Sequence, residues 1–391
     1  MKNSLIIQSG GPTSVINSTL YGVIKELKAK NKEGIIYGSK NGVIGIIKNN
    51  LINLSEVSDE NIELLKQTNG AILGSSRHKL SDDFTNSDFT NILNNIRINE
   101  IHYIFVIGGN DSMDTCDKLN QYFIINKIDC KVLGLPKTID NDLIVTDHTP
   151  GYGSALKYIA STITTIKQDI KCYEKGKVTI VEIMGRDTGW LTAGSLLAKL
   201  SDNAPDLIYL PEGKFDLTKF YNDVKSIYEK QKYCLVCISE GVEVIDTSDA
   251  KVDAFGHKQL GGLAATLEKM VEENLNLPTR SIELNIMQRC SSFINSKTDI
   301  LEAIRCGRHA VRYMLKGKSG KMVYMKRVSE YKIKYLLTEL HPIANSIKYF
   351  PTNWILNDNY ISDEFLTYAL PLIQGEEKVT YENGIIKLAK I

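Results

Sequence analysis

The sequence lacks the features that would place it in several large functional classes. Its 47 basic and 46 acidic residues give a formal net charge of +1, so there is no basic excess of the kind that binds nucleic acid or a membrane surface. No apolar stretch reaches 18 residues, and the short apolar run after Ser4 is too short for a signal peptide. We therefore expect a cytoplasmic protein with no nucleic-acid and no membrane partner.

Cysteine and histidine are not arranged as a metal cage. Of the seven cysteines, only Cys234 and Cys237 form a C-x-x-C pair, and that pair lies inside an apolar run. In a strand, residues three apart face opposite sides, so a redox or metal role for this pair is disfavoured. The six histidines show no H-x-x-x-H spacing. We expect any metal to be held by oxygen atoms.

The chain does have a regular alternation of strand-like and helix-like segments. Its 391 residues exceed the usual size of one hydrophobic core, which favours two joined domains. Most of the strand-like runs are continuously apolar, as in strands covered by helices on both faces. The alternation predicts an α/β fold with mostly parallel sheets. The predicted strands are 5–9, 34–37, 103–107, 131–135, 178–183, 207–210 and 233–239, and the predicted helices include 14–27, 111–124, 154–171, 188–200 and 262–275.

Three of these strands end in glycine-rich loops that open a helix. The loops are Gly10-Gly11-Pro12-Thr13, the segment 108–112, and Met184-Gly185-Arg186. Glycine lets backbone amides approach an anion closely, and a helix N-terminus adds about half a positive charge. A single such loop could be only a tight turn, but three at strand ends favour phosphate binding. The chain has neither a Walker P-loop nor a complete G-x-G-x-x-G fingerprint.

Another strand end presents carboxylates. The segment Pro136-Lys137-Thr138-Ile139-Asp140-Asn141-Asp142 follows an apolar run. Phosphoryl transfer to an alcohol needs a base for the hydroxyl proton and cations against the phosphate charge, and these residue types suit both tasks. Taken alone, the segment is equally compatible with a turn in which Asp and Asn cap backbone amides.

The order of these motifs resembles the phosphofructokinase family from residue 5 to about residue 326. The resemblance implies two Rossmann-like three-layer α/β/α domains with mostly parallel sheets, as in the phosphofructokinase fold. It implies a donor-phosphate domain at 1–142, to which the chain returns around 279–315, a sugar-phosphate domain at 143–278, and an extension of unknown role at 316–391. The matching pieces are Gly10-Gly11, Leu73 to Arg77, Gly108 to Ser112, Pro136 to Asp142, Met184 to Arg186, Ser239-Glu240-Gly241 and Gln288-Arg289.

The resemblance also implies roles for individual residues. Asp140 corresponds to the base that takes the proton of the sugar 1-hydroxyl, and Gly11 would offer its amide to the donor phosphate. Arg280 corresponds to an arginine that one subunit contributes to its neighbour across their interface, which implies a homodimer or homotetramer. Thr138 and Asp142 would lie beside the transferring phosphate and the metal. The implied contacts of the sugar phosphate are Thr138, Ile139, Asp140, Met184, Gly185, Arg186, Glu240, Ile286, Met287, Gln288 and Arg289.

Two positions bear on the donor. ATP-using relatives have Gly-Gly-Asp-Gly-Ser and a glycine before Thr-Ile-Asp, whereas this chain has Asp111 and Lys137 at those places. A carboxylate at 111 would repel an α-phosphate, and a lysine at 137 could offset charge on the transferring and leaving phosphates. Asp111 could also simply cap the following helix. The pair favours pyrophosphate over ATP as donor.

The sequence departs from the family at other positions. Asn110 stands where the family usually has an aspartate that binds Mg²⁺, so either a neutral carbonyl or a bridging water would have to serve there, with Asp142 or phosphate oxygens as the other ligands. Ile286 replaces a histidine that contacts the sugar, and Lys177 replaces an arginine at a second phosphate site. The segment 253–262 is similar to the corresponding segment of pyrophosphate-type relatives, but it could equally be only a turn. The segment 246–253 is expected to be an acidic surface loop.

Taken with these residues, the resemblance implies a Mg²⁺-dependent transfer of a phosphoryl group from pyrophosphate to the 1-hydroxyl of fructose 6-phosphate. The expected products are fructose 1,6-bisphosphate and phosphate, in a reversible step of glycolysis and gluconeogenesis. One alternative is an ATP-dependent phosphofructokinase. Another is a sugar-phosphate sensor without turnover, against which the intact Asp140 argues.

Overall fold

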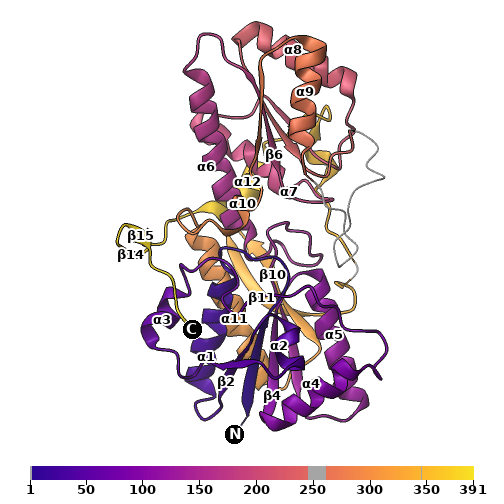
Figure 1. Ribbon diagram of the computed structural model, residues 1–391, viewed down its shortest axis with the longest axis vertical. Helices are drawn as coiled ribbons and strands as arrows, with labels where there is room; N and C mark the ends of the chain where they lie inside the picture. The colour runs from indigo at the N-terminus through magenta and orange to yellow at the C-terminus, as the bar shows by residue number, and fades with distance from the viewer. Residues whose placement is uncertain (1, 245–260, 345) are drawn as a thin grey trace.

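The computed structural model describes residues 2–244, 261–344 and 346–391, which form two α/β domains stacked end to end (Figure 1). The larger domain contains the N-terminus and the last residues of the chain, and the smaller domain lies above it in Figure 1. The acidic stretch 246–253 and nearly all of the segment 253–262 fall outside the described residues. Among the residues that are described, no helix is both long and apolar enough to cross a bilayer.

The larger domain is built on a seven-stranded sheet with the order β11-β10-β5-β4-β1-β2-β3. The five inner strands run parallel, and only the two edge strands, β3 and β11, pair in antiparallel fashion. Carboxyl ends of parallel strands meet at one edge of a sheet. The strands are β1 (Asn3–Gln8), β2 (Ile36–Ser39), β3 (Leu51–Asn53), β4 (Ile101–Gly108), β5 (Lys131–Pro136), β10 (Lys321–Ser329) and β11 (Lys332–Glu339).

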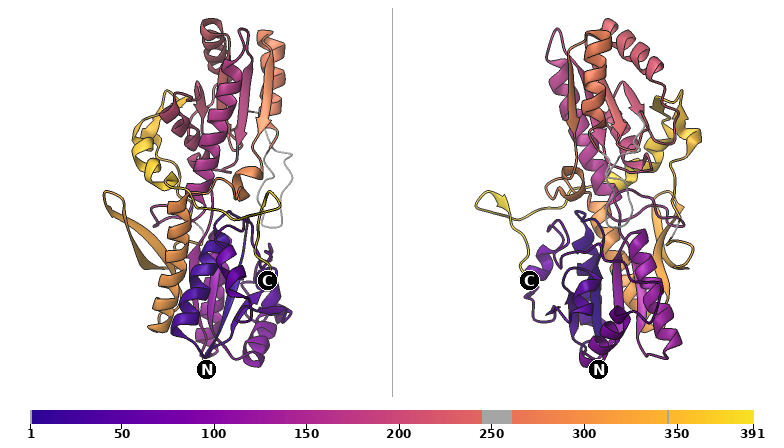
Figure 2. Two further views of the ribbon diagram at one scale, coloured as in Figure 1. Left: turned by 90° about the vertical axis from the view of Figure 1, so that its left-hand side faces the viewer. Right: turned by 45° about the vertical axis from the view of Figure 1, so that its right-hand side comes forward.

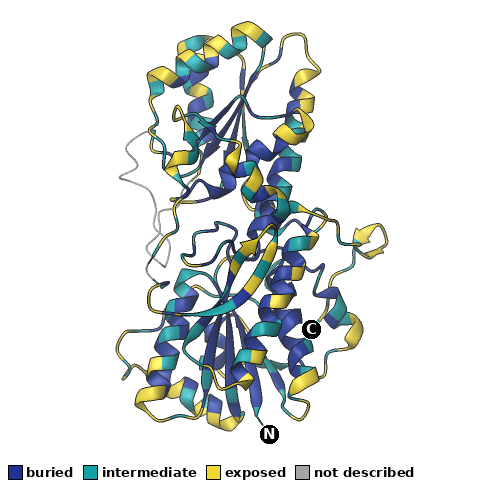
Figure 3. Cartoon of the chain, turned by 180° about the vertical axis from the view of Figure 1, so that it is seen from behind, coloured by how far each residue is buried: buried dark blue, intermediate teal, exposed yellow. Residues whose placement is uncertain are grey.

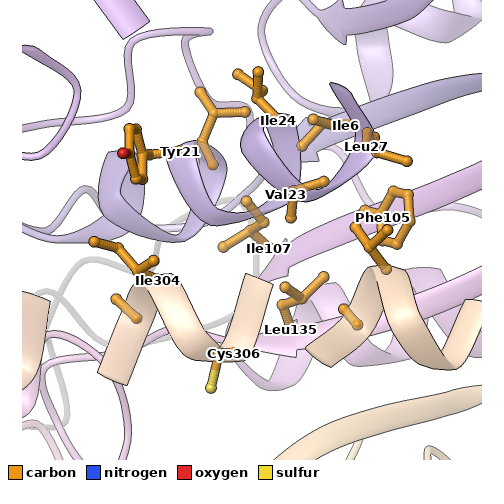
Figure 4. Close-up of a cluster of buried hydrophobic side chains, with 14 of the residues drawn as sticks. Ile6, Tyr21, Val23, Ile24, Leu27, Phe105, Ile107, Leu135, Ile304 and Cys306 are labelled. Atoms are coloured by element: carbon orange, nitrogen blue, oxygen red, sulfur yellow. The ribbon is translucent and has the colours of Figure 1, made fainter. Parts of the chain in front are cut away.

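Continuous apolar strands supply both faces of this sheet. Alternate side chains point to opposite faces, so Ile6 and Phe105 join one core while Ile7 and Val106 join the other. Burying one such side chain contributes roughly 1.5–3 kcal/mol. The first face is covered by α1 (Ile16–Lys30) and α11 (Lys297–Leu315), as Figure 4 shows, and the second by α2 (Val43–Ile47), α4 (Ser87–Ile98) and α5 (Asn110–Ile125).

After the smaller domain, helix α11 returns the chain to the larger domain. There it crosses α1 at close range. Gly22 on α1 faces the main chain of Ile304, and Gly307 on α11 faces the main chain of Thr19. A Cβ atom at either glycine would overlap the opposite backbone. The two glycines therefore allow the helices to approach more closely than larger side chains would.

The smaller domain has a four-stranded, wholly parallel sheet with the order β7-β8-β6-β9. Helices cover both faces, and Figure 3 shows the buried strands between more exposed helices. Both domains thus have three layers, and the predicted α/β fold with mostly parallel sheets is confirmed. The elements are β6 (Val178–Ile183), β7 (Leu207–Tyr209), β8 (Cys234–Ser239) and β9 (Thr279–Glu283), with α6 (Tyr152–Lys171), α7 (Trp190–Ala193), α8 (Leu217–Gln231) and α9 (Leu263–Leu275).

The segment 316–391 does more than extend the fold. Strands β10 and β11 enlarge the first sheet, and their hairpin projects from one side of the larger domain (Figure 2). The chain then crosses to the smaller domain, where Phe350 and Phe365 join its core. The last residues return to the larger domain, where the amide of Ala389 donates to Thr68 Oγ1. The remaining short elements are α3 (Asp59–Leu64), α10 (Met287–Cys290), α12 (Glu364–Ala369), β12 (Ile355–Leu356), β13 (Tyr360–Ile361), β14 (Tyr381–Glu382), β15 (Ile385–Ile386) and the 3₁₀ helices η1 (Gly194–Ser201), η2 (Thr352–Trp354) and η3 (Leu370–Ile373).

Candidate active site

A cleft of about 350 Å³ lies where the two domains meet. The residues that follow β1, β4 and β5 line it from the larger domain, and those that follow β6 and β8 line it from the smaller domain. The strand ends selected from the sequence therefore converge on one cavity. They comprise the start of α5 (109–112), Glu240 and three segments that we name after the roles the family resemblance implies: a donor loop (10–13), a catalytic segment (136–142) and a sugar loop (184–186).

Lys137 joins the donor loop to the catalytic segment. Its side chain is buried, and its Nζ donates a 2.7 Å hydrogen bond to the main-chain oxygen of Gly11. Gly10, with a φ of +78°, lies directly against the same ammonium group. Burial lowers the pKa of Lys137 to about 8, although Asp140 and Asp142 oppose that shift. At neutral pH the Lys137 side chain is therefore mainly charged, but its pKa lies only a little above neutral.

The start of α5 contributes the polar residues beside this lysine. Gly109 is the N-cap, and Asn110 and Asp111 form the first helical turn. All three line the cleft. An acidic side chain in the first turn is favoured by the helix dipole, so Asp111 also stabilises the helix that positions it.

Two carboxylates of the catalytic segment share a poorly solvated environment. Burial raises the pKa of Asp140, while Arg186 and Lys137 act in the opposite direction. Burial, with a further contribution from Asp140, raises the pKa of Asp142 to about 6. The amide of Asp140 donates to Thr138 Oγ1 over 3.1 Å, which fixes the turn. A carboxylate with a raised pKa at a cleft suits proton abstraction.

Two buried oxygens at this site, one on Asn110 and one in the Asp142 carboxylate, have no hydrogen-bond partner among the described residues. These atoms are Asn110 Oδ1 and Asp142 Oδ1. The other atoms of the two side chains approach each other, with Asn110 Nδ2 lying 3.4 Å from Asp142 Oδ2. Buried polar atoms normally have partners, so this pair fits a cation or an ordered water. The described residues contain no group of three His, Cys, Asp or Glu side chains that could hold a metal without substrate oxygens.

The smaller domain holds its sugar loop through Glu240. The carboxylate accepts hydrogen bonds from the amides of Gly185 and Arg186 at 3.2 and 3.0 Å. Burial raises the pKa of Glu240. Arg186 has a left-handed φ of 52°, and a Cβ at Gly241 would overlap its main-chain oxygen. The loop is therefore fixed through its main chain, and Arg186 lines the cleft from the smaller domain.

The residues expected from the segment 286–289 do not all reach the cleft. Arg289 lines it, and its buried Nε has no acceptor in the described part of the chain. Ile286 and Met287 are 59% and 55% exposed and do not line the cavity. Gln288 is buried and donates to the oxygen of Asn285.

Arg280 also lies away from the cavity. It is on β9, an edge strand of the smaller sheet, and its NH1 is 3.6 Å from Asp169 Oδ2. The structure thus brings together Gly11, Asp111, Asn110, Arg289, the catalytic segment, the sugar loop and Glu240, but not Arg280 or the residues 286–288.

Several lining residues were not assigned a role from the sequence. His78 lines the cleft and is held by Asp88 through a 2.7 Å contact. Ser346 and Ile347 line it from the C-terminal segment. Arg77 also lines the cleft and belongs to a matched motif. Ser346 and Ile347 have no motif around them, so no local signal in the sequence could have identified them.

Basic groups on both walls, a glycine-rich loop with a helix N-terminus, and a desolvated carboxylate define a site for phosphoryl transfer. The phosphofructokinase family matches residues 3–314. The chain is 36% identical over its full length, and over 96% of the relative, to the pyrophosphate–fructose 6-phosphate 1-phosphotransferase of Halomonas elongata. It therefore belongs to the phosphofructokinase family.

Solved structures and a second relative agree with this membership. The pyrophosphate-dependent phosphofructokinase from Nitrosospira multiformis superposes with a TM-score of 0.90 at 34% identity, covering 98% of this chain and 95% of that one. A sulfofructose kinase from Alkalicoccus urumqiensis is 34% identical over 85% of this chain and 86% of its own length. The family therefore includes relatives whose names indicate different acceptors.

Proposed function

We propose that this protein transfers a phosphoryl group from pyrophosphate to the 1-hydroxyl of fructose 6-phosphate, giving fructose 1,6-bisphosphate and phosphate. The observation that carries the proposal is the placement of Lys137 and Asp111 in one cleft with Asp140. The names of the relatives from Halomonas elongata and Nitrosospira multiformis support it. The reaction would be reversible and would serve glycolysis and gluconeogenesis in the cytoplasm.

In this mechanism Asp140 takes the proton of the sugar hydroxyl as the oxygen attacks the transferring phosphorus. Its raised pKa makes it a better general base than an exposed aspartate. Lys137 and the Gly11 amide offset charge on the phosphoryl group and on the departing phosphate. The sugar loop, Glu240 and Arg289 hold the sugar phosphate, so that the two reacting oxygens are in line with the phosphorus.

The donor set at the cleft fits Mg²⁺. Asn110 Oδ1 and Asp142 Oδ1 are the buried oxygens without partners, and Mg²⁺ prefers oxygen ligands while keeping several waters. When bound, the ion would neutralise phosphate charge. Among the described residues that line the cleft, these are the two buried side-chain oxygens without partners, so waters and substrate phosphates would complete the coordination.

The donor preference follows from charge and space. Asp111 lies in the first turn of α5 at the cavity wall, where a longer nucleotide would have to pass a carboxylate. We therefore favour pyrophosphate over ATP.

The two domains would divide the substrates between them: the larger domain would bind the donor and the smaller domain the sugar phosphate. Arg280, exposed on an edge strand, supports our expectation of a homodimer or homotetramer.

The experiment is an initial-rate assay of the purified protein with fructose 6-phosphate and Mg²⁺, with pyrophosphate or ATP supplied separately. We expect fructose 1,6-bisphosphate to form with pyrophosphate and not with ATP, and chelation of Mg²⁺ to stop the reaction. Turnover with ATP alone would overturn the donor assignment. Turnover only after replacing fructose 6-phosphate by its 6-sulfonate analogue would overturn the acceptor. Binding of the sugar without product would indicate a sensor.

A further inference from the structure

A short strap of chain, residues 346–350, passes between the two domains at the active site. It lies beyond residue 314, where the match to the family ends. Ser346 and Ile347 line the cleft, whereas Lys348 turns the other way, behind the catalytic segment. The strap therefore contacts both the substrate cavity and the structure that supports the catalytic carboxylates.

The Lys348 side chain binds three oxygens. Its Nζ donates to Asn141 Oδ1 at 3.0 Å, to the main-chain oxygen of Asp147 at 2.9 Å, and to that of Thr146 at 3.2 Å. These three bonds use all the protons of an ammonium group, although burial lowers the pKa of Lys348 to about 7 against the opposing effect of Asp147 and Asp142. The amide of Lys348 also donates to the main-chain oxygen of Asp142 at 2.8 Å. One residue of the strap thus fixes both neighbours of Asp140 on its C-terminal side.

Asn141 needs this support because its conformation is uncommon. Its φ is 54°, in the left-handed region, and its side chain is fully buried. The amide group of Asn141 donates to the Tyr368 hydroxyl at 3.0 Å, while its oxygen accepts from Lys348. Both partners come from the C-terminal segment. The turn that aims Asp140 therefore depends on residues far away in the sequence.

The strap also binds the smaller domain directly behind the sugar loop. Trp190 Nε1 donates to the main-chain oxygen of Lys348 at 2.8 Å, and the Lys348 ammonium lies 5.0 Å from the centre of the Trp190 ring. Glu212 accepts from the amide of Phe350 at 2.8 Å and from that of Gly189 at 3.0 Å. Trp190 begins α7, so the strap connects the catalytic segment to the helix that follows the sugar loop.

We propose that Lys348 is a positioning residue, which holds Asn141 and thereby keeps Asp140 aligned with the substrate bound by the smaller domain. The inference rests on the proposed function, because it concerns the same reaction. A displacement of about 1 Å at a reacting group can reduce turnover roughly 100-fold. Loss of Lys348 is expected to lower kcat by about that factor, while the contacts that bind both substrates stay in place.

The test compares Lys348→Met with Lys167→Met in the full-length protein. Lys167 is also buried and also bonded, to Asp206 at 2.7 Å, but it lies in the smaller domain away from the cleft. For Lys348→Met we expect kcat to fall about 100-fold, with both KM values within about threefold of the wild type. For Lys167→Met we expect a lower melting temperature and an unchanged kcat.

A double-mutant cycle with Asn141→Ser separates positioning from a general loss of stability. If Lys348 acts through Asn141, the double variant will be no slower than the slower single variant. Should Lys348→Met not fold, Asn141→Ser reports the same contact from the catalytic side.

Additive losses, an unchanged kcat in folded Lys348→Met, or equal losses in Lys167→Met would overturn the inference. Because every rate is compared with the wild type, a wild type without turnover would instead refute the proposed function.

Discussion

Replacing Lys137 by methionine should remove a positive charge from the place where we expect the donor phosphate to bind. The buried Nζ touches the oxygen of Gly11 and lies against Gly10, so it is next to the place where a donor phosphate would bind. Removing one preorganised charge-stabilising group from such a site typically costs 10²–10³ in rate, or roughly 3–4 kcal/mol. We expect kcat/KM for pyrophosphate to fall by about that factor.

The pH profile gives this prediction a second readout. With a pKa of about 8, Lys137 is mostly charged at pH 7 and mostly neutral at pH 9. Since kcat/KM reports ionisations of the free enzyme, the wild-type profile should decline above about pH 8. The Lys137→Met profile should be flat in that region.

Both effects can be measured from initial rates between roughly pH 6.5 and 9.5, with pyrophosphate varied and the sugar phosphate saturating. Lys167→Met serves as the control for the loss of a buried lysine elsewhere. If Lys137→Met kept kcat/KM within about threefold of the wild type, or retained the decline at high pH, the role given to Lys137 would be wrong.

Three further predictions concern the donor, the fold and the sugar loop. Asp111→Gly should lower the rate with pyrophosphate and open the cleft to ATP, measured as the ratio of kcat/KM for the two donors; an unchanged ratio would contradict this. His148 lies between Asp147 and Glu302, which raise its pKa to about 9 against the opposing effect of burial. Its contribution, up to about 3 kcal/mol, is complete below pH 6.5 and is lost as the pH rises to about 9. Chemical unfolding at both pH values should show the loss in the wild type and not in His148→Gln. Gly241→Ala should raise KM for fructose 6-phosphate by displacing the sugar loop, whereas KM for pyrophosphate should stay unchanged.

The sequence predicts the parts of this structure that depend on local patterns. Continuous apolar runs such as 131–135 and 178–183 form central strands because both faces of each sheet are covered. The glycine-rich loops follow strand ends, and parallel strands bring those ends to one edge. The convergence of Gly11, Asp140 and Arg186 on one cleft could therefore be anticipated from their motifs.

Parts that depend on long-range packing could not be predicted in the same way. Strands β10 and β11 are only partly buried and lie in a region without motifs, yet they extend the first sheet. Lys348 looks like any surface lysine in the sequence, and only the folded chain shows it behind Asn141. Ile286 and Met287 directly precede the matched pair Gln288-Arg289, but both are more than half exposed and do not line the cleft.

The central claim is that Asp140 takes the proton of the sugar hydroxyl in this cleft. The direct measurement is the turnover of Asp140→Asn with pyrophosphate, together with its affinity for fructose 6-phosphate by calorimetry. General-base catalysis is worth about 10²–10⁴ in rate, so kcat should fall within that range. The dissociation constant of the sugar phosphate should stay within about threefold of the wild type. A variant that kept wild-type turnover, or that lost sugar binding together with turnover, would contradict the account.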